Sequence, residues 1–152
     1  LASAHIEQLR REMNALASTL PEYEVVMGMY GVGKTYGPQL IAEIGDVSRF
    51  THREAITAFA GVDPGVEQSG QHNSKSNKAS KCGTGRLRKT LFQVMTTLLQ
   101  NAPENEPVYK FLNRKRSEGK PYYVYMTAGA NKFLRIYYGK VKAHLRSLEQ
   151  NE

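Results

Sequence analysis

Residues 68–91 read QSGQHNSKSNKASKCGTGRLRKTL, and the expected fold is built outward from this stretch. Its first half consists of Gln, Ser, Asn, Gly and Lys, which cannot bury a core, so we expect an exposed loop there. Its second half becomes helical, because apolar residues recur on one helical face: Leu87, Leu91, Val94, Met95 and Leu98. The stretch predicts a long basic loop that leads into a core-forming helix.

The same stretch carries six Lys or Arg side chains and no Asp or Glu. Lysine and arginine neutralise phosphates, and the free amides at a helix start add to the attraction. A small candidate nucleophile, Ser69, lies between Gln68 and Gly70 at the mouth of the loop. A solvated basic loop without a ligand is the plain alternative. The candidate phosphate contacts are Lys75, Lys78, Lys81, Arg86, Arg88 and Lys89.

Charge is divided unevenly along the 152 residues, whose net charge is +7. Residues 1–67 carry five Lys or Arg and nine Asp or Glu, a balance of −4, whereas residues 68–152 carry sixteen and five, a balance of +11. Such an imbalance favours a polyanionic partner, most often nucleic acid, with an anionic membrane surface as the weaker competitor. The sequence has no apolar run long enough to span a membrane.

The sequence also indicates the cellular compartment of the protein and suggests that the chain is part of a longer one. A single cysteine, Cys82, excludes an internal disulfide and fits a reducing compartment. We expect a cytoplasmic, nucleoid-associated protein. The chain opens without Met inside an expected helix, which suggests a fragment of a longer protein.

Residues 1–20 form an expected helix with apolar residues at spacings of 3, 4, 3 and 4, which is an a/d heptad seam. The seam is Ile6, Leu9, Met13, Leu16 and Leu20. Fewer than three heptads leave two interpretations open: the end of a coiled coil that pairs subunits, or a helix docked on its own domain.

Residues 22–46, preceded by the helix-breaking Pro21, predict two short helices joined by Gly31-Val32-Gly33. This pattern is typical of a helix-hairpin-helix, in which the glycines let the turn approach DNA and the amides bind a phosphate without reading the base sequence. We take Gly31, Val32, Gly33 and Lys34 as candidate DNA contacts. The apolar residues that would pack the two helices together are Val25, Val26, Leu40 and Ile41.

The hairpin also matches the nucleotide-binding P-loop pattern, from Gly28 through Gly33, Lys34 and Thr35. That loop needs a buried strand before it and a long helix after it, and the preceding YEVVM passes for a strand. We expect Pro38 to interrupt the following helix, and no later strand places an Asp to hold magnesium. Nucleotide hydrolysis is therefore the disfavoured alternative.

The rest of the chain predicts further helices and no convincing strand, so the expected fold class is all-α. Residues 51–54 resemble a capping box that opens a helix ending at Gly61. Other expected helices cover 84–101, 107–118, 122–126 and 131–148, with Gly129 as a joint between the last two.

Catalytic chemistry is sparse in the sequence. The four His and one Cys lack ligand spacing, so a zinc site is not expected, and no carboxylate cluster indicates a two-metal nuclease. We therefore predict no metal site and no cofactor in this chain. Nine tyrosines are present, and Tyr122, Tyr123, Tyr137 and Tyr138 are interpreted as packing or interface residues.

Taken together, these motifs resemble the C-terminal domain of bacterial insertion-sequence transposases related to the Piv DNA invertase. The matching segments are GVG at 31–33, GPQLIAEIGDVSRF at 37–50, AITAFAGVDPGVEQSG at 55–70, SKCGTGRLRKTL at 80–91 and AGANKFLRIYYGKVK at 128–142. In that family an N-terminal DEDD, RuvC-like domain precedes a serine-bearing domain, and a bridge RNA guides the enzyme.

The resemblance implies DNA strand exchange, with Ser69 as the nucleophile that forms a phosphoserine with DNA. It also implies that magnesium binds in the N-terminal domain, which lies outside this chain, and that residues 1–20 end a coiled coil pairing subunits in a homo-oligomer. One departure is Cys82, where the family usually has Arg. A non-catalytic DNA- or RNA-binding helix-hairpin-helix module remains the alternative function.

Overall fold

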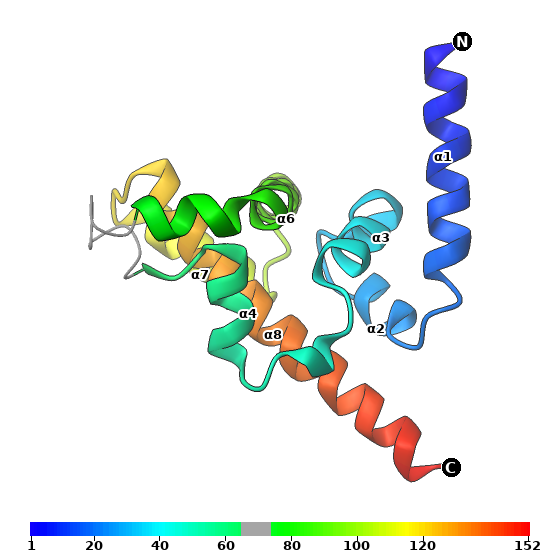
Figure 1. The fold of residues 1–152 in the computed structure, drawn as a ribbon. Helices are drawn as coiled ribbons and strands as arrows, with labels where there is room; N and C mark the ends of the chain where they lie inside the picture. The colour runs from blue at the N-terminus through cyan, green and yellow to red at the C-terminus, as the bar shows by residue number, and fades with distance from the viewer. Residues whose placement is uncertain (65–73) are drawn as a thin grey trace.

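The computed structural model describes the backbone of residues 1–64 and 74–152, and the side chains of residues 1–64 and 85–152. Within those ranges every regular element is helical, which confirms the all-α class (Figure 1). The elements are α1 (Ala2–Ala17), α2 (Tyr23–Met27), α3 (Gly33–Ile44), the 3-10 helix η1 (Val47–Arg49), α4 (Arg53–Ala60), α6 (Ser74–Asn101), α7 (Pro107–Ser117) and α8 (Tyr122–Gln150).

Two long helices, α6 and α8, organise the core. Helices α3, α4, α7 and α8 all contact α6, and α4 and α7 pack on α8. The five apolar residues expected on one face of the 84–101 helix are all buried, with at most 1% exposed. They meet Phe133, Leu134 and Tyr137 of α8, which are also buried. The period of 3.6 residues in the sequence therefore identified the core side of α6 correctly.

Helix α1 extends along one side of the molecule as an arm and contacts α3 (Figure 1). Its only buried residue is Ala17, and four of the five seam residues are exposed. Leu9 and Leu16 are 63% and 72% exposed, so the seam does not dock on its own domain. Pairing with a second helix would bury such a seam, and the coiled-coil interpretation stays a prediction.

Helix α6 begins at Ser74, earlier than the sequence indicated. The predicted loop over the first half of 68–91 is therefore wrong from Ser74 onward, because Ser, Asn and Lys in a row do not prevent a helix that is continuous with a packed one. Residues 65–73 lie outside the described part of the chain.

Helix α8 runs without interruption from Tyr122 to Gln150, so the predicted joint at Gly129 is wrong. Gly129 is a packing residue instead. A methyl group at this position would lie 2.9 Å from Leu112 Cγ of α7 and 3.1 Å from Met95 Sδ of α6. The missing side chain lets α6 and α7 approach α8 at one point.

The start of α4 also differs from the prediction. Its N-cap is His52 rather than Thr51, and no side chain caps the helix. Glu54 instead lies 3.2 Å from His52 Nδ1, so the capping box is wrong. The other end is as expected: Gly61 ends the helix in the left-handed region with φ of 71°.

No helix in the described ranges is long and apolar enough to cross a bilayer.

Candidate nucleic-acid interface

Helices α2 and α3 are joined by a tight turn at residues 28–32, as the sequence predicted. Val26, Leu40 and Ile41 are buried between the helices and the body, and Val25 is partly buried against the same core. Two glycines have positive φ here: Gly31 in the turn, at 85°, and Gly33 at the start of α3, at 62°. Both angles favour glycine over any other residue.

The two glycines face different surroundings. A methyl group on Gly31 would lie 3.0 Å from Leu98 Cγ and 3.1 Å from the Val94 carbonyl oxygen, so Gly31 holds the turn against α6. Val32 is 1% exposed and belongs to the core. Around Gly33, in contrast, no atom of the described residues lies within 4 Å of that position. Of Gly31, Val32 and Gly33, Gly33 is therefore the one open to a ligand.

The first turn of α3 offers unpaired donors beside Gly33. The N-cap Val32 provides no side-chain hydrogen bond. The first N–H groups of any helix lack partners within that helix, so those of α3 remain available to an anion. Lys34 follows immediately and is exposed. Backbone donors and a cation therefore point to the same small region.

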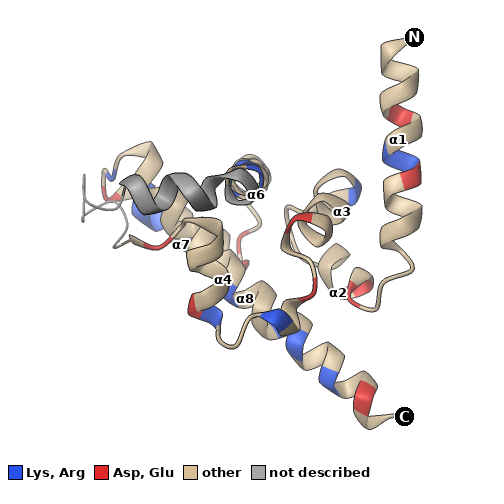
Figure 2. Ribbon diagram, viewed as in Figure 1, with Lys and Arg blue, Asp and Glu red and all other residues tan. Residues whose placement is uncertain are grey.

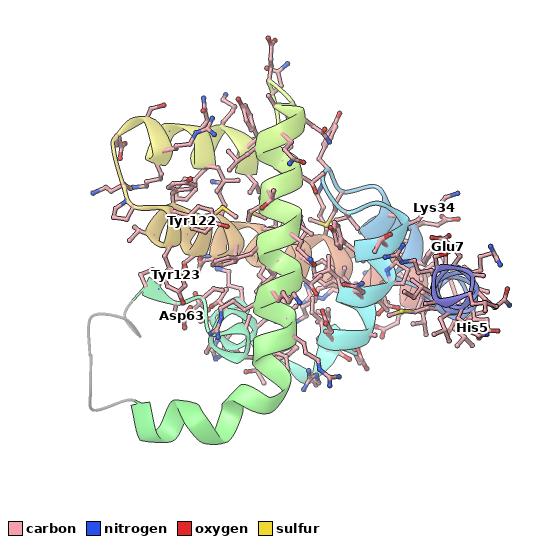
Figure 3. The ribbon with its side chains drawn as sticks, turned by 90° about the horizontal axis from the view of Figure 1, so that it is seen from above. His5, Glu7, Lys34, Asp63, Tyr122 and Tyr123 are labelled. Carbon is pink, nitrogen blue, oxygen red and sulfur yellow. The ribbon has the colours of Figure 1, made fainter. Side chains whose placement is uncertain are left out.

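A groove of about 420 Å³ opens at this turn. We call it the hairpin groove; it is lined by Arg10, Gly31, Val32, Gly33, Lys34, Thr35, Tyr36, Thr97 and Asn101. A second hollow of about 270 Å³ adjoins it and shares Arg10, Lys34 and Thr35. Figure 3 shows Lys34 beside α1, on the side where Glu7 lies. The groove thus joins α1, the hairpin and the end of α6.

The basic residues of α6 occupy different places. Arg86 and Lys89 are exposed. Arg88 is half-buried, and its Nη1 lies 3.0 Å from where a side chain on Gly61 would begin, so it packs against the end of α4. Lys75, Lys78 and Lys81 lie on α6, but their side chains are outside the described residues, as is Ser69 altogether.

One side of α6 connects Arg86 to the hairpin groove. Arg86 and Thr97 are eleven residues apart, which is about three helical turns, so they lie on the same side of α6. Between them Thr90 donates a hydrogen bond to Gln39 Oε1 of α3 at 3.3 Å. Figure 3 shows α6 in front, with Lys34 to one side and Tyr122 and Tyr123 to the other. Arg86, Lys89, Thr96 and Gln100 are exposed at neighbouring positions around α6, and we call them the open face of α6. Arg86 and the groove residue Thr97 lie at its edge, next to the buried Thr90 that meets α3.

Basic residues continue beyond this face. Figure 2 shows Lys and Arg on α6, α7 and α8. On α7, Arg114 and Lys115 lie 4.0 and 3.9 Å from the carboxylate of Glu118, so part of that charge is neutralised. The basic residues of the C-terminal half are therefore spread over three helices, α6, α7 and α8.

A known protein family matches the part of the chain that contains the hairpin and α6. The model of the IS116/IS110/IS902 transposase family matches residues 23–110, which is more than half of the chain. The chain belongs to the IS116/IS110/IS902 transposase family. The match includes the hairpin, all of α6 and the start of α7.

Two curated proteins are also similar in sequence to this transposase-family chain. They are the pilin gene-inverting proteins of Moraxella bovis and Moraxella lacunata, each 28% identical over 144 residues. The alignment covers 92% of this chain but 44% of each relative, so the chain spans less than half of their length. No solved structure matches.

The nucleotide-binding alternative does not fit the fold of this family member. The residues before Gly28 form helix α2, where a P-loop needs a strand. The predicted interruption at Pro38 is wrong, however, because α3 runs through Pro38 to Ile44. The helical surroundings of Gly28, rather than the proline, exclude the P-loop.

Arg10 is a groove residue that the sequence did not indicate. The structure places it in the lining of the hairpin groove. Its Nη1 lies 3.3 Å from Glu7 Oε1, and both side chains are more than half exposed. No local pattern identifies this role, because it depends on how α1 meets α3.

Among the described residues, Tyr137 does not suit nucleophilic chemistry. Tyr137 is fully buried, and this burial, with the nearby charge of Glu22, raises the pKa of its hydroxyl. It is therefore not available as a nucleophile. No group of three or more His, Cys, Asp or Glu among the described residues is placed to hold a metal ion.

Proposed function

We propose that the full-length protein is a DNA transposase or site-specific recombinase, in which this chain binds DNA and supplies Ser69 as the nucleophile. Membership of the transposase family carries the proposal. The name of the pilin gene-inverting relatives, which refers to inversion of a gene, supports recombination as the reaction class.

DNA binding is assigned to the open face of α6 and to the hairpin groove, acting as a helix-hairpin-helix. The groove combines the free amides of α3 with the cations Arg10 and Lys34. Arg86 and Lys89 extend the positive surface along α6. Contacts of this kind bind phosphates and position the duplex without reading its sequence.

The nucleophile is assigned to Ser69, beyond the described residues. Its hydroxyl oxygen would attack a DNA phosphorus, forming a P–O bond as the bond to a deoxyribose oxygen breaks. The serine proton leaves, and the released oxygen gains one. Lysine and arginine residues near the phosphate would stabilise its charge during transfer.

Activation of the serine is assigned to a part of the protein outside this chain. A serine hydroxyl needs a base or metal to become a nucleophile. We propose that magnesium binds in an N-terminal DEDD domain, that a bridge RNA directs the target, and that α1 pairs subunits. The relatives are more than twice as long as the aligned segment, which leaves room for such a domain. We expect this enzyme to act on the nucleoid.

The test is Ser69→Ala in the full-length protein with its RNA and magnesium. We expect the covalent protein–DNA adduct on a denaturing gel to disappear, while DNA affinity changes less than twofold. Ser80→Ala is the matched control, since it removes a serine hydroxyl outside the QSG element, and it should keep the adduct. An adduct that persists in Ser69→Ala would assign the nucleophile elsewhere.

A second candidate is a non-catalytic nucleic-acid-binding module, favoured by the hairpin groove, which explains binding without chemistry. The same gel separates the two functions. Salt-sensitive DNA binding without any covalent adduct in the wild-type protein would support the module and exclude the enzyme.

A further inference from the structure

An aromatic cluster borders the open face of α6 opposite the hairpin groove. It is formed by Phe92 of α6 and by Tyr122, Tyr123 and Tyr125 of α8. The ring centroids of Phe92 and Tyr123 are 5.8 Å apart, and those of Phe92 and Tyr122 are 6.4 Å apart. We call these four residues the aromatic platform.

The platform is exposed although its rings are held in place. Tyr122 and Tyr123 are 56% and 44% exposed. Tyr122 packs edge-on against Phe92 at an interplanar angle of 82° and against Tyr125 at 80°. Tyr123 packs against Phe92 in a tilted arrangement at 58°. Aromatic pairs of these geometries stabilise one another. Two exposed rings that pack on neighbouring rings are a suitable surface for stacking.

Positive charge lies on both sides of the platform. Lys89 precedes Phe92 by three residues on α6, so their side chains are neighbours on the helix surface, and Lys89 is exposed. Lys120 is exposed in the turn just before Tyr122. Figure 3 also shows Asp63 on this side of the molecule, where Asn131 donates a hydrogen bond to its carboxylate at 3.3 Å. The lysines offer a place for phosphates beside the rings.

We propose that the aromatic platform stacks an unpaired base of a DNA strand whose backbone follows Lys89 and Lys120. A protein partner would need a broad apolar surface, whereas here two exposed rings have the exposed Lys120 near them in the chain, and the exposed Lys89 is near Phe92, against which they pack. Aromatic rings flanked by basic side chains are the combination that binds unpaired nucleotides. Because the hairpin groove contacts phosphates only, the platform would distinguish distorted DNA from a regular duplex.

This inference rests on the proposed DNA binding, and its test separates the two. The full-length protein is titrated with two DNA duplexes, one fully paired and one carrying an unpaired 2-aminopurine as a bulge. Stacking on a tyrosine should quench the 2-aminopurine fluorescence. In Tyr122→Ala/Tyr123→Ala we expect the quenching to disappear and affinity for the bulged DNA to fall about tenfold. Affinity for the paired duplex should stay within twofold.

Two control variants isolate stacking. Tyr122→Phe/Tyr123→Phe keeps the rings and should keep the quenching. Val124→Ala removes exposed apolar area on the same helical turn, since Val124 is 41% exposed, and should change nothing. Unchanged quenching in the double alanine variant would overturn the platform. Quenching seen only with a bulged RNA that carries 2-aminopurine, and not with the bulged DNA, would also overturn it. So would loss of a dimer by the double alanine variant in light scattering, because the rings would then contact a second copy of the chain. Failure to bind either DNA would overturn the proposed function itself.

Discussion

At the scale of single residues, Gly31 and Gly33 show how one short motif divides its tasks. Both have positive φ, but Gly31 lies against α6 whereas Gly33 borders open space. The spacing of the two glycines in the sequence does not distinguish their roles. Only the neighbours of each residue separate a packing glycine from one that lets a ligand approach.

These neighbours predict different costs for the same substitution. Gly33→Ala should lower the free energy of unfolding by about 1–2 kcal/mol, the cost of a side chain in the left-handed region. Gly31→Ala should lower it further, by about 1–3 kcal/mol for crowding Val94 and Leu98. Urea unfolding followed by circular dichroism measures both. Equal losses would mean that the turn does not press on α6 at Gly31.

The loss of DNA affinity should follow the opposite order from the loss of stability, with Gly33→Ala the more affected variant. Gly33→Ala is expected to weaken binding of a short duplex, because the added methyl group stands where a phosphate would approach the α3 amides. A residual folded fraction of Gly31→Ala should bind nearly as well as wild type. Fluorescence anisotropy at conditions where both variants are folded measures this, and unchanged affinity in Gly33→Ala would remove the hairpin from the DNA interface.

At the scale of elements, α8 contains a matched pair of glycines. Gly129 is buried against Met95 and Leu112, whereas nothing lies within 4 Å of a side chain at Gly139. Gly129→Ala should destabilise the protein by about 1–3 kcal/mol through overpacking. Gly139→Ala should be neutral or stabilising by up to about 1 kcal/mol, because alanine favours the helix. A stabilising Gly129→Ala in thermal unfolding would contradict the close packing of α6 and α7 at this position.

Helix α1 predicts self-association through its exposed seam. Leu9→Glu/Leu16→Glu should shift the full-length protein toward a smaller species in analytical ultracentrifugation, since charges on the seam oppose helix pairing. Gln8→Glu places the same charge outside the seam and should leave the assembly unchanged. If both variants sediment like wild type, subunits do not pair through α1.

At the scale of the whole molecule, the charge of the C-terminal half predicts strong salt dependence of DNA binding. With about six phosphate contacts, affinity should fall on the order of 10³-fold between 50 and 200 mM salt. Lys34→Gln and Arg86→Gln should each reduce the slope of log affinity against log salt by about one. Arg53→Gln is the control, since Arg53 lies on α4 and pairs with Glu54 at 3.6 Å. A slope near zero in wild type would exclude phosphate binding as the source of affinity.

The sequence by itself determined the helical class, the core face of α6 and the two helices of the hairpin. Each depends on local periodicity or on turn residues, which neighbouring positions in the chain already contain. It overestimated local signals at Gly129, Pro38, Thr51 and the stretch after Ser74. There, packing against α6 and α7, or continuity with a packed helix, outweighed the preference of single residues.

Only the tertiary structure decided which charges and rings face one another. Arg10 enters the hairpin groove because α1 meets α3, and Arg88 turns toward Gly61 rather than solvent. Tyr122 and Tyr123, interpreted from sequence as packing or interface residues, are exposed and pack against Phe92, which lies about thirty residues earlier. Such contacts join segments far apart in the chain. Their geometry follows from how the helices cross, which no local pattern records.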